Sequence, residues 1–186
     1  MIDEAEIRSI ARRYGEPLRL AVDLEIGQDL FLTRFIRSDD RRGEVVMALE
    51  MANGKVLLHR KGHYDPPSFR LLSGGINHDE PALRALHREA REETNLQVEV
   101  QRFLGFIEYR MHFGEIDLPF VSYVFHVSEL AGQLVPDYGE IAELRVVEPS
   151  EIQTYADALR NIPGERGFWG RWRAIAHDVV AETWGG

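Results

Sequence analysis

Residues 74–96 read GGINHDEPALRALHREAREETNL, and the rest of the chain is arranged around this stretch. It opens with the glycine pair Gly74-Gly75, passes through an acidic turn and continues as one predicted helix. Pro81 suits the first helical turn, because its missing N–H would have no helical partner there. Asn95 follows the last turn and is, after glycine, the residue best able to adopt the left-handed conformation that ends a helix.

The predicted helix places three carboxylates, those of Glu89, Glu92 and Glu93, on one side. Like charges at these spacings destabilise a helix by roughly a few tenths of a kcal/mol. One interpretation is therefore a solvated face, relieved by neighbouring arginines. The other is a site for hard divalent cations, which prefer oxygen ligands. The glycine pair upstream favours the cation site, because its flexible backbone can approach a ligand or a metal ion closely. The buried stripe of the helix is expected to contain Leu83, Leu86, Ala90 and Thr94.

The same residues resemble the signature of the Nudix hydrolase family, G-x5-E-x7-R-E-U-x-E-E-x-G-U, in which U is an aliphatic residue. Eight of the nine fixed positions match, so a coincidence is improbable. The final glycine is replaced by Asn95, a mild change because asparagine also ends helices. Ser73 stands where the family often has proline. The matching positions are Gly74, Glu80, Arg88, Glu89, Ala90, Glu92, Glu93 and Leu96.

The resemblance implies hydrolysis of a diphosphate that is joined to another moiety. It also implies Mg2+, with Mn2+ as a substitute, held by Glu89, Glu92 and Glu93 and by a backbone carbonyl at or beside Gly74. Such an ion neutralises phosphate charge and positions the phosphates.

Further roles follow from the resemblance. Arg88 would orient a glutamate, and Glu80 would support the geometry between the loop and the helix. The general base in this family is either a helix glutamate, here Glu92 or Glu93, or a carboxylate on a later loop. Glu140 is our candidate, because it lies in the loop before the last core strand. The competing carboxylates are Glu143, Glu115 and Asp117.

The residues that bind the substrate are less well defined by the sequence. Arg60, Lys61 and Arg70 are candidates for phosphate contacts, and Gly75 for a close backbone approach. Four aromatic residues lie in or near predicted loops, where each can either stack on a base or pack against the protein. These residues are Tyr64, Tyr109, Phe113 and Tyr138.

Composition excludes several classes of protein. The chain has 186 residues, enough for one domain with a sizeable core, and no cysteine. The absence of cysteine excludes disulfides, thiolate metal sites and cysteine nucleophiles; it also argues against the isopentenyl diphosphate isomerases, which share the Nudix fold and use a cysteine. A net charge of −9 argues against binding nucleic acid polymers. With no secretory signal and no apolar run of membrane-spanning length, we expect a cytoplasmic protein without a membrane partner.

The resemblance implies an α+β fold, a Nudix-like α/β/α sandwich with a mixed sheet, and the hydrophobic pattern predicts strands and helices along the chain. Residues 3–14 are a predicted helix that Asp3 can cap, and residues 18–26 and 30–36 are predicted strands paired as a hairpin. The polar loop around residues 38–43 separates a predicted N-terminal extension, residues 1–43, from a Nudix domain over residues 44–186. The remaining predicted strands are 45–51, 55–60, 69–72, 96–100, 103–111, 120–127 and 144–147; predicted helices follow Pro149 and Pro163 at the C-terminal end.

The chain length and the N-terminal strand pair resemble ADP-ribose or nucleotide-sugar pyrophosphatases, in which extra strands often build a homodimer. Dinucleoside polyphosphates and oxidised nucleoside triphosphates stay open as substrates. One rival interpretation is a non-catalytic nucleotide-binding regulator, but such domains typically lose the signature glutamates that this chain keeps. A di-iron carboxylate protein would need a second acidic helix with a Glu-x-x-His motif, and the sequence has none.

Overall fold

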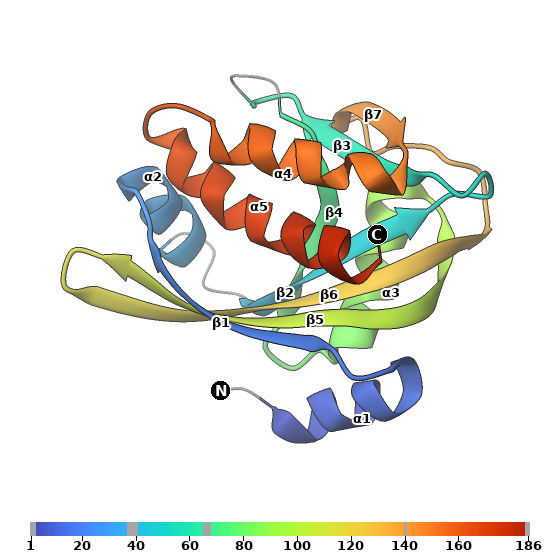
Figure 1. The fold of residues 1–186 in the computed structure, drawn as a ribbon, viewed down its shortest axis with the longest axis horizontal. Coiled ribbons are helices and arrows are strands. Elements are labelled where there is room, and N and C mark those ends of the chain that lie inside the picture. Colours follow the sequence, from blue (N-terminus) through green and yellow to red (C-terminus); the bar gives the residue numbers. More distant parts are fainter. Residues whose placement is uncertain (1–2, 37–40, 65–67, 140, 185–186) are drawn as a thin grey trace.

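The seven strands of the fold form one mixed sheet (Figure 1). A computed structural model describes residues 3–36, 41–64, 68–139 and 141–184. The strand order is β1-β5-β6-β2-β4-β3-β7. β1 runs parallel to β5 and β2 parallel to β6, while the other neighbouring pairs are antiparallel. The strands are β1 (Leu18–Glu25), β2 (Arg41–Glu50), β3 (Val56–Lys61), β4 (Arg70–Asn77), β5 (Gln97–Phe113), β6 (Ile116–Ala131) and β7 (Ile141–Val147).

Helices cover both faces of the sheet, which confirms the predicted α+β sandwich. α1 and α3 pack on one face and α5 on the other, with α4 lying along α5 (Figure 1). The helices are α1 (Glu4–Tyr14), α2 (Gln28–Leu30), a π-helical turn (Phe31–Ile36), α3 (Ala82–Thr94), a 3-10 turn (Pro149–Glu151), α4 (Ile152–Arg160) and α5 (Arg166–Thr183).

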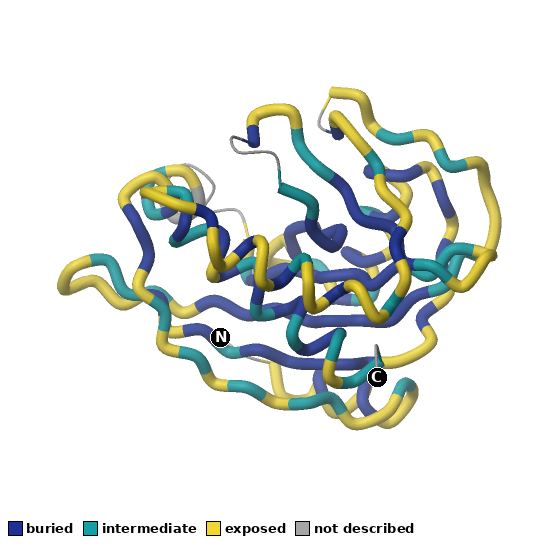
Figure 2. The backbone as a smooth tube through the Cα atoms, turned by 45° about the horizontal axis from the view of Figure 1, so that its top comes forward, coloured by how far each residue is buried: buried dark blue, intermediate teal, exposed yellow. Residues whose placement is uncertain are grey.

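Two apolar cores lie on opposite faces of the sheet, and the buried central strands between them stand out in Figure 2. In the first core, Ile7 and Ile10 of α1 and Leu86 of α3 pack around the same strands. In the second, Trp172 and Val179 of α5 pack against the other face. α1 and β1 are therefore part of the main body of the fold, although they lie in the predicted N-terminal extension.

The signature stretch folds as its local sequence predicts. α3 begins directly after Pro81, and Asn95 follows it with a φ of 61°, the left-handed conformation expected there. The capping role of Asp3 is also confirmed, because its side chain accepts hydrogen bonds from the backbone N–H of Ala5 at 2.9 Å and Glu6 at 3.0 Å. Of the predicted buried stripe, Leu83 is only half-buried.

The predicted hairpin between residues 18–26 and 30–36 is wrong. The first segment is a strand, but its partner is β5, and the second segment is α2 followed by the π-helical turn. Phe31 stacks on Phe113 at 4.4 Å, and the backbone N–H of Asp29 donates to Glu165 at 3.1 Å. These contacts with distant segments hold this part of the chain in a helical conformation.

Several strands are longer than predicted. The expected loop over residues 112–119 is a tight turn at Gly114, whose φ is +59°, between β5 and β6. β2 begins at Arg41 and β7 at Ile141, several residues earlier than expected. None of the helices in the described ranges combines the length and the apolar character needed to cross a membrane.

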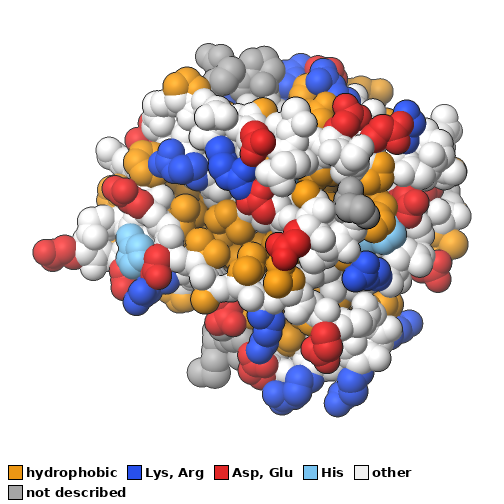
Figure 3. Space-filling view, viewed as in Figure 1, with side chains coloured by type: hydrophobic (Ala, Val, Ile, Leu, Met, Phe, Trp, Pro, Cys, Tyr) orange, Lys and Arg blue, Asp and Glu red, His pale blue; other side chains and the backbone are white. Residues whose placement is uncertain are grey.

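Apolar side chains gather on the face of the molecule that carries α5 (Figure 3). β1 is an edge strand in which half-buried and exposed residues alternate. Its half-buried residues contact the α5 core without being fully covered by it. They are Leu18, Leu20, Val22 and Leu24.

Candidate active site

The glycine pair lies near the end of β4, directly against α3 and β2. A Cβ atom added at Gly74 would overlap the carboxyl group of Glu89, and one at Gly75 would overlap the side chain of Arg41. Both glycines are buried. A larger residue at position 74 would therefore push Glu89 away from the sheet.

Arg88 connects the signature residues to one another. Its Nη1 donates to Glu89 Oε1 at 2.7 Å and to Glu92 Oε2 at 3.0 Å. Its Nη2 donates to the carbonyl oxygen of Gly75 at 2.8 Å. The same guanidinium binds both carboxylate oxygens of Glu80, at 2.9 Å and 2.7 Å. One side chain thus fixes two of the predicted metal ligands relative to the glycine backbone.

The ion pairs of Arg88 change the acid–base properties of the groups involved. The hydrogen bond from Arg88 lowers the pKa of Glu80, and the hydrogen bond to Glu80 raises the pKa of Arg88. The predicted repulsion among the helix glutamates is therefore partly offset by this arginine, which binds Glu89 and Glu92 directly.

Glu92 and Glu93 occupy different environments. The side chain of Glu92 is 59% exposed, whereas the residue Glu93 is only 6% exposed and faces the sheet. Burial by itself would lower the pKa of Arg70, but the neighbouring Tyr64 and the carboxylates of Glu93 and Glu44 raise it overall. Glu93 therefore lies close enough to Arg70 for their charges to interact.

The C-terminal end of α3 is held by the loop that follows β6. The backbone N–H of Val135 donates to the carbonyl of Thr94 at 3.0 Å, and that of Asp137 to the carbonyl of Glu93 at 3.2 Å. The side-chain amide of Asn95 donates to the carbonyl of Gln133 at 3.1 Å. The last-turn carbonyls thus find partners outside the helix, which keeps Glu93 in place.

A cavity of about 200 Å³ opens beside Gly74. Its lining is rich in positive charge and includes two aromatic rings, those of Tyr64 and Trp169, whose centroids are 4.8 Å apart. The lining residues are Arg41, Glu44, Lys61, His63, Tyr64, Arg70, Ser73, Gly74, Trp169 and Arg173. Positive groups next to the glycine pair suit a ligand that carries phosphates.

Two of these lining residues come from α5 and were not predicted from the sequence. The apolar stripe of α5 indicates a packing helix, and Trp172 and Val179 do pack in the core. Arg166, Trp169 and Arg173, at three- and four-residue spacings, form a second face of the same helix. In the sequence, only these spacings indicate the second face of α5.

Arg70 and Arg173 are both anchored in the wall of the cavity. Arg70 is 4% exposed and donates to Tyr64 Oη at 2.9 Å and to Ser73 Oγ at 2.7 Å. Arg173 donates to the buried carboxylate of Glu44 at 2.6 Å, and Ser122 donates to the other oxygen of Glu44 at 2.7 Å. These fixed geometries preorganise positive charge at the cavity wall.

The other predicted site residues lie elsewhere. Arg60 binds Glu143 at 3.2 Å between β3 and β7 and does not line this cavity. Asp117 binds His112 at 2.6 Å near the tip of the β5–β6 hairpin, which also carries Glu115 and points away from α3 (Figure 1). Glu140 lies outside the described residues.

Three of the four candidate aromatic residues lie outside the cavity lining. Tyr109 is buried in the second core, and Phe113 stacks on Phe31. Tyr138 is 80% exposed on the loop after β6. Tyr64 is the one that lines the cavity.

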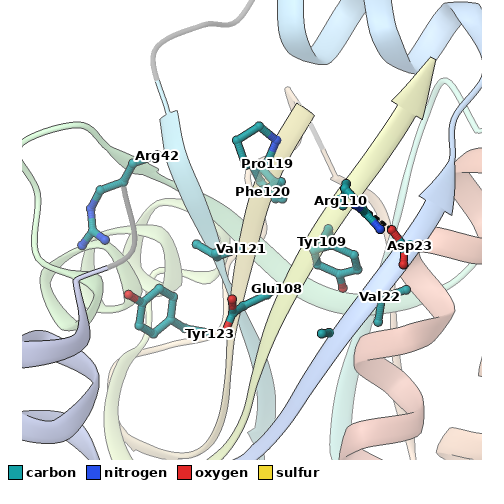
Figure 4. Close-up of a pocket in the computed structure, with 11 residues that line it drawn as sticks. Val22, Asp23, Arg42, Glu108, Tyr109, Arg110, Pro119, Phe120, Val121 and Tyr123 are labelled. Carbon is teal, nitrogen blue, oxygen red and sulfur yellow. Dashed lines mark hydrogen bonds and ion pairs between the residues drawn. The ribbon is translucent and has the colours of Figure 1, made fainter. Parts of the chain in front are cut away.

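A second cavity, of about 490 Å³, lies over β1, β5 and β6 beside Arg42 (Figure 4). Unlike the first cavity, it does not have Gly74 of the signature in its lining, so it is not the candidate active site. Its lining residues are Ala21, Val22, Asp23, Arg42, Glu108, Tyr109, Arg110, Pro119, Phe120, Val121 and Tyr123.

The donor set at α3 fits a hard divalent cation by its chemistry. Glu89, Glu92 and Glu93 contribute carboxylate oxygens from α3, and the carboxyl group of Glu89 lies directly against Gly74. Within the described ranges, no three His, Asp or Glu side chains already converge as a metal cluster. Arg88 binds Glu89 and Glu92 instead, so a cation at this position would require these carboxylates to turn.

Comparison with known proteins identifies a single family. A family model described as the NUDIX domain matches residues 40–166. No curated protein matches the chain.

Solved structures with a similar fold agree with this family match. A NUDIX hydrolase from Nitrosomonas europaea has a TM-score of 0.54 and 15% identity, over 76% of this chain and 89% of that one. The MutT protein from Methanosarcina mazei Go1 has a TM-score of 0.50 and 16% identity, over 77% of this chain and 94% of that one. The dihydroneopterin triphosphate pyrophosphohydrolase from E. coli also has a TM-score of 0.50 and 16% identity, over 77% of this chain and 94% of that one. At these identities the likeness shows the fold.

Proposed function

Because the chain belongs to the Nudix family of hydrolases, we propose that it cleaves the diphosphate bond of a nucleoside diphosphate joined to a second moiety, with Mg2+ as its metal ion. The observation that carries this proposal is the contact of Arg88 with Glu80, Glu89, Glu92 and the Gly75 carbonyl. That contact holds the signature carboxylates beside a cavity lined by positive charge. ADP-ribose or a nucleotide sugar is the favoured substrate class.

In this proposal Glu89, Glu92 and Glu93 hold the metal ion, together with a backbone carbonyl at or beside Gly74. When bound, a divalent ion supplies neutralisation of phosphate charge and polarisation of the phosphoryl oxygens. Mn2+ has similar preferences for oxygen ligands and is the expected substitute. Arg88 orients Glu89 and Glu92, and its own position is set by the two-point contact with Glu80.

The substrate is proposed to lie in the cavity beside Gly74. Arg70, Lys61 and Arg173 supply positive charge for the phosphates, and Tyr64 with Trp169 supplies an aromatic surface for the base. Excess positive charge in this wall also explains how a chain with a net charge of −9 can bind an anionic substrate.

The proposed reaction also needs a general base that activates the attacking water. Glu140 is our candidate for the general base, because it directly precedes β7 in the sequence. Among the competing carboxylates, Glu143 is engaged by Arg60 and Arg145, and Asp117 by His112. Glu92 is well exposed at the surface of α3, which makes the helix itself an alternative source of the base.

A hydrolysis screen tests the proposed function. ADP-ribose, nucleotide sugars, dinucleoside polyphosphates, NADH and nucleoside triphosphates, including oxidised ones, are each incubated with Mg2+ or Mn2+. Glu93→Gln serves as the inactive variant, and Glu99→Gln, an exposed strand carboxylate, as the matched control. We expect wild type and Glu99→Gln to turn over one substrate class that Glu93→Gln does not.

Two results of the screen would count against the proposal. Turnover that survives in Glu93→Gln would exclude the α3 carboxylates as the reactive centre. No turnover of any substrate, with nucleotide still bound in equilibrium dialysis, would favour a regulatory nucleotide-binding domain.

Three broader predictions accompany this function. We propose that the protein is cytoplasmic and that it forms a homodimer. We also propose that the chain divides into an N-terminal extension (residues 1–43) and the Nudix domain (residues 44–186). The half-buried apolar residues on the edge strand β1 are compatible with a partner chain. Light scattering coupled to size-exclusion chromatography would decide between a mass near 21.4 kDa and twice that value.

A further inference from the structure

The signature helix α3 has no N-terminal side-chain cap of its own. The first backbone N–H groups of a helix have no partner within the helix, and a side chain usually satisfies one of them. Here the N-cap residue is Pro81, which makes no side-chain hydrogen bond, and the first turn of α3 contains no acidic residue. The start of the helix therefore depends on groups from elsewhere in the fold.

A carboxylate from α1 occupies this position. Glu6 Oε1 accepts a hydrogen bond from the backbone N–H of Ala82 at 2.7 Å, across a separation of 76 residues in sequence. A negative charge at a helix N-terminus is favoured by the helix dipole. Glu6 thus caps α3 from a different helix, while Asp3 caps α1.

Two other side chains fix the Glu6 carboxylate in place. Arg42 Nη2 donates to both of its oxygens, at 3.0 Å and 2.8 Å, and the hydroxyl of Tyr123 donates to Oε2 at 3.2 Å. Only 15% of the Glu6 side chain and 17% of the Arg42 side chain are exposed. Arg42 and Tyr123 are drawn together in Figure 4, where the guanidinium and the hydroxyl turn toward one another.

The contacts of Arg42 continue toward the signature carboxylates. Its Nε and Nη2 donate to the carbonyl oxygen of Glu80, at 3.1 Å and 2.8 Å. The Glu80 carboxylate in turn binds Arg88, which holds Glu89. A continuous series of charge-assisted hydrogen bonds therefore runs from α1 to the proposed metal ligands.

We propose that Glu6 is a positioning residue for the hydrolytic reaction, because it fixes the start of α3 and, through Arg42 and Glu80, the placement of Arg88 and its glutamates. The expected effect on kcat rests on the proposed function. Glu6 lies outside residues 40–166, which the family model matches. The proposal therefore assigns α1 a part in the reaction, although α1 lies outside the part of the sequence that the family model matches.

Three substitutions at position 6 separate the geometry of the cap from its charge. Glu6→Ala removes the carboxylate. Glu6→Asp keeps the charge but is one methylene shorter and should not reach Ala82 N. Glu6→Gln keeps an oxygen of the right reach and loses the charge. Glu4→Gln is the matched control, because Glu4 lies on the same helix and binds Arg19 at 2.7 Å, away from α3.

The measurements are kcat and KM on the substrate found in the screen, and amide hydrogen exchange of a peptide spanning the first turn of α3. Both are made well below the melting temperature of each variant. For Glu6→Ala and Glu6→Asp we expect kcat to fall on the order of tenfold or more, because small displacements of catalytic groups are costly. KM should change by less than about twofold, since the cavity residues are not moved. Exchange in the first turn should become faster in both variants. Glu6→Gln should recover most of the protection but only part of the kcat, because its one carbonyl oxygen can accept from Ala82 N whereas its amide group cannot accept from Arg42. Glu4→Gln should match wild type.

The proposal is overturned if folded Glu6→Asp keeps the kcat and the exchange protection of wild type, or if Glu6→Gln is no better than Glu6→Asp in both. If Glu6→Ala does not fold, the Glu6→Asp and Glu6→Gln variants still test the proposal. Failure of the proposed function has a different signature, because wild type would then hydrolyse nothing. Hydrogen exchange would still report whether Glu6 caps α3.

Discussion

Arg88 and Glu80 form a two-point ion pair, with Nε to Oε1 at 2.9 Å and Nη2 to Oε2 at 2.7 Å. The two residues belong to the fixed positions of the signature, and the pair joins the turn before α3 to the middle of the helix. Since the same guanidinium also holds Glu89, Glu92 and the Gly75 carbonyl, the pair sets the geometry of the whole cluster.

Arg88→Lys should abolish most activity even though the charge is kept. An ammonium group cannot make the forked contacts of a guanidinium, so Glu80 and Glu89 would not both be held. We expect kcat to fall on the order of a hundredfold and the free energy of unfolding to fall by roughly 2 kcal/mol, because the Glu80 side chain is 9% exposed and would lose a partner. Arg91→Lys, on the exposed face of α3, is the control for both assays. A fully active Arg88→Lys protein would remove the orienting role from Arg88.

Glu92→Gln should separate activity from stability. Glu92 is well exposed and makes one contact at 3.0 Å with Arg88, so its loss should change the free energy of unfolding by less than about 1 kcal/mol. Turnover should nevertheless be abolished if Glu92 binds the metal ion. Steady-state kinetics and urea unfolding on the same preparation measure the two effects. A large fall in stability with retained turnover would mean that the carboxylate is structural.

The signature helix could be predicted because its determinants are local. Pro81 and Asn95 mark its ends by their own backbone preferences, and both act as expected. The segment Leu30–Ile36 is predicted as a strand and is helical in the structure, because a short apolar run fits a buried strand or a helix equally well. Its conformation is decided by Phe113 and Glu165, which are distant in sequence.

The contributions of other elements to the site could not be predicted in this way. Glu6 reaches α3, and Trp169 and Arg173 reach the cavity, only because the sheet brings α1 and α5 near β4 and α3. Each of these residues has an ordinary local explanation, as a surface charge or as part of a packing helix. Their roles depend on tertiary contacts that the periodicity of a single helix does not specify.

Glu80 should make the stability of the protein fall in acid. The hydrogen bond from Arg88 lowers the pKa of Glu80 below the ordinary value of 4.5. A carboxyl group with a depressed pKa in the folded state stabilises the fold above its unfolded-state pKa, and the stabilisation is lost as the pH falls through the folded-state pKa. Urea unfolding between pH 7 and pH 3 should therefore show a smaller loss in Glu80→Gln than in wild type. Parallel curves for the two proteins would contradict the expected coupling.

His177 should add a second acid-sensitive step. Burial lowers its pKa to about 3, and its Nε2 accepts a hydrogen bond from the backbone N–H of Leu71 at 3.0 Å. The folded state therefore keeps this ring neutral while the unfolded state binds a proton below about pH 6.5. The contribution of His177 to the free energy of unfolding is complete above about pH 6.5 and should fall by about 1.4 kcal/mol per pH unit as the pH decreases toward 3.

The His177 contribution can be isolated by substitution. His177→Gln should reduce the loss of stability between pH 6.5 and pH 4 and leave the part that comes from His59, whose pKa is also lowered by burial. His78→Gln, at an exposed position, should leave the full loss in place. Proton NMR of the imidazole signals gives an independent check. A resonance from His177 that titrates near pH 6.5 in the folded protein would exclude this mechanism.

Trp169→Ala should weaken substrate binding more than it slows the chemical step. Trp169 lines the cavity next to Gly74, and its ring centroid lies 4.8 Å from that of Tyr64. The α3 carboxylates are not among the residues that line this cavity. Base–aromatic stacking is worth about 1–3 kcal/mol, so KM should rise by roughly 5- to 150-fold with kcat nearly unchanged. Trp169→Phe should restore part of the affinity, because a smaller ring still offers a face for stacking. The matched control is Phe168→Ala, on the neighbouring position of α5 and outside the cavity lining. If Trp169→Ala and Phe168→Ala change KM equally, the aromatic wall of the cavity does not bind the base, and the substrate must be held by its phosphates alone.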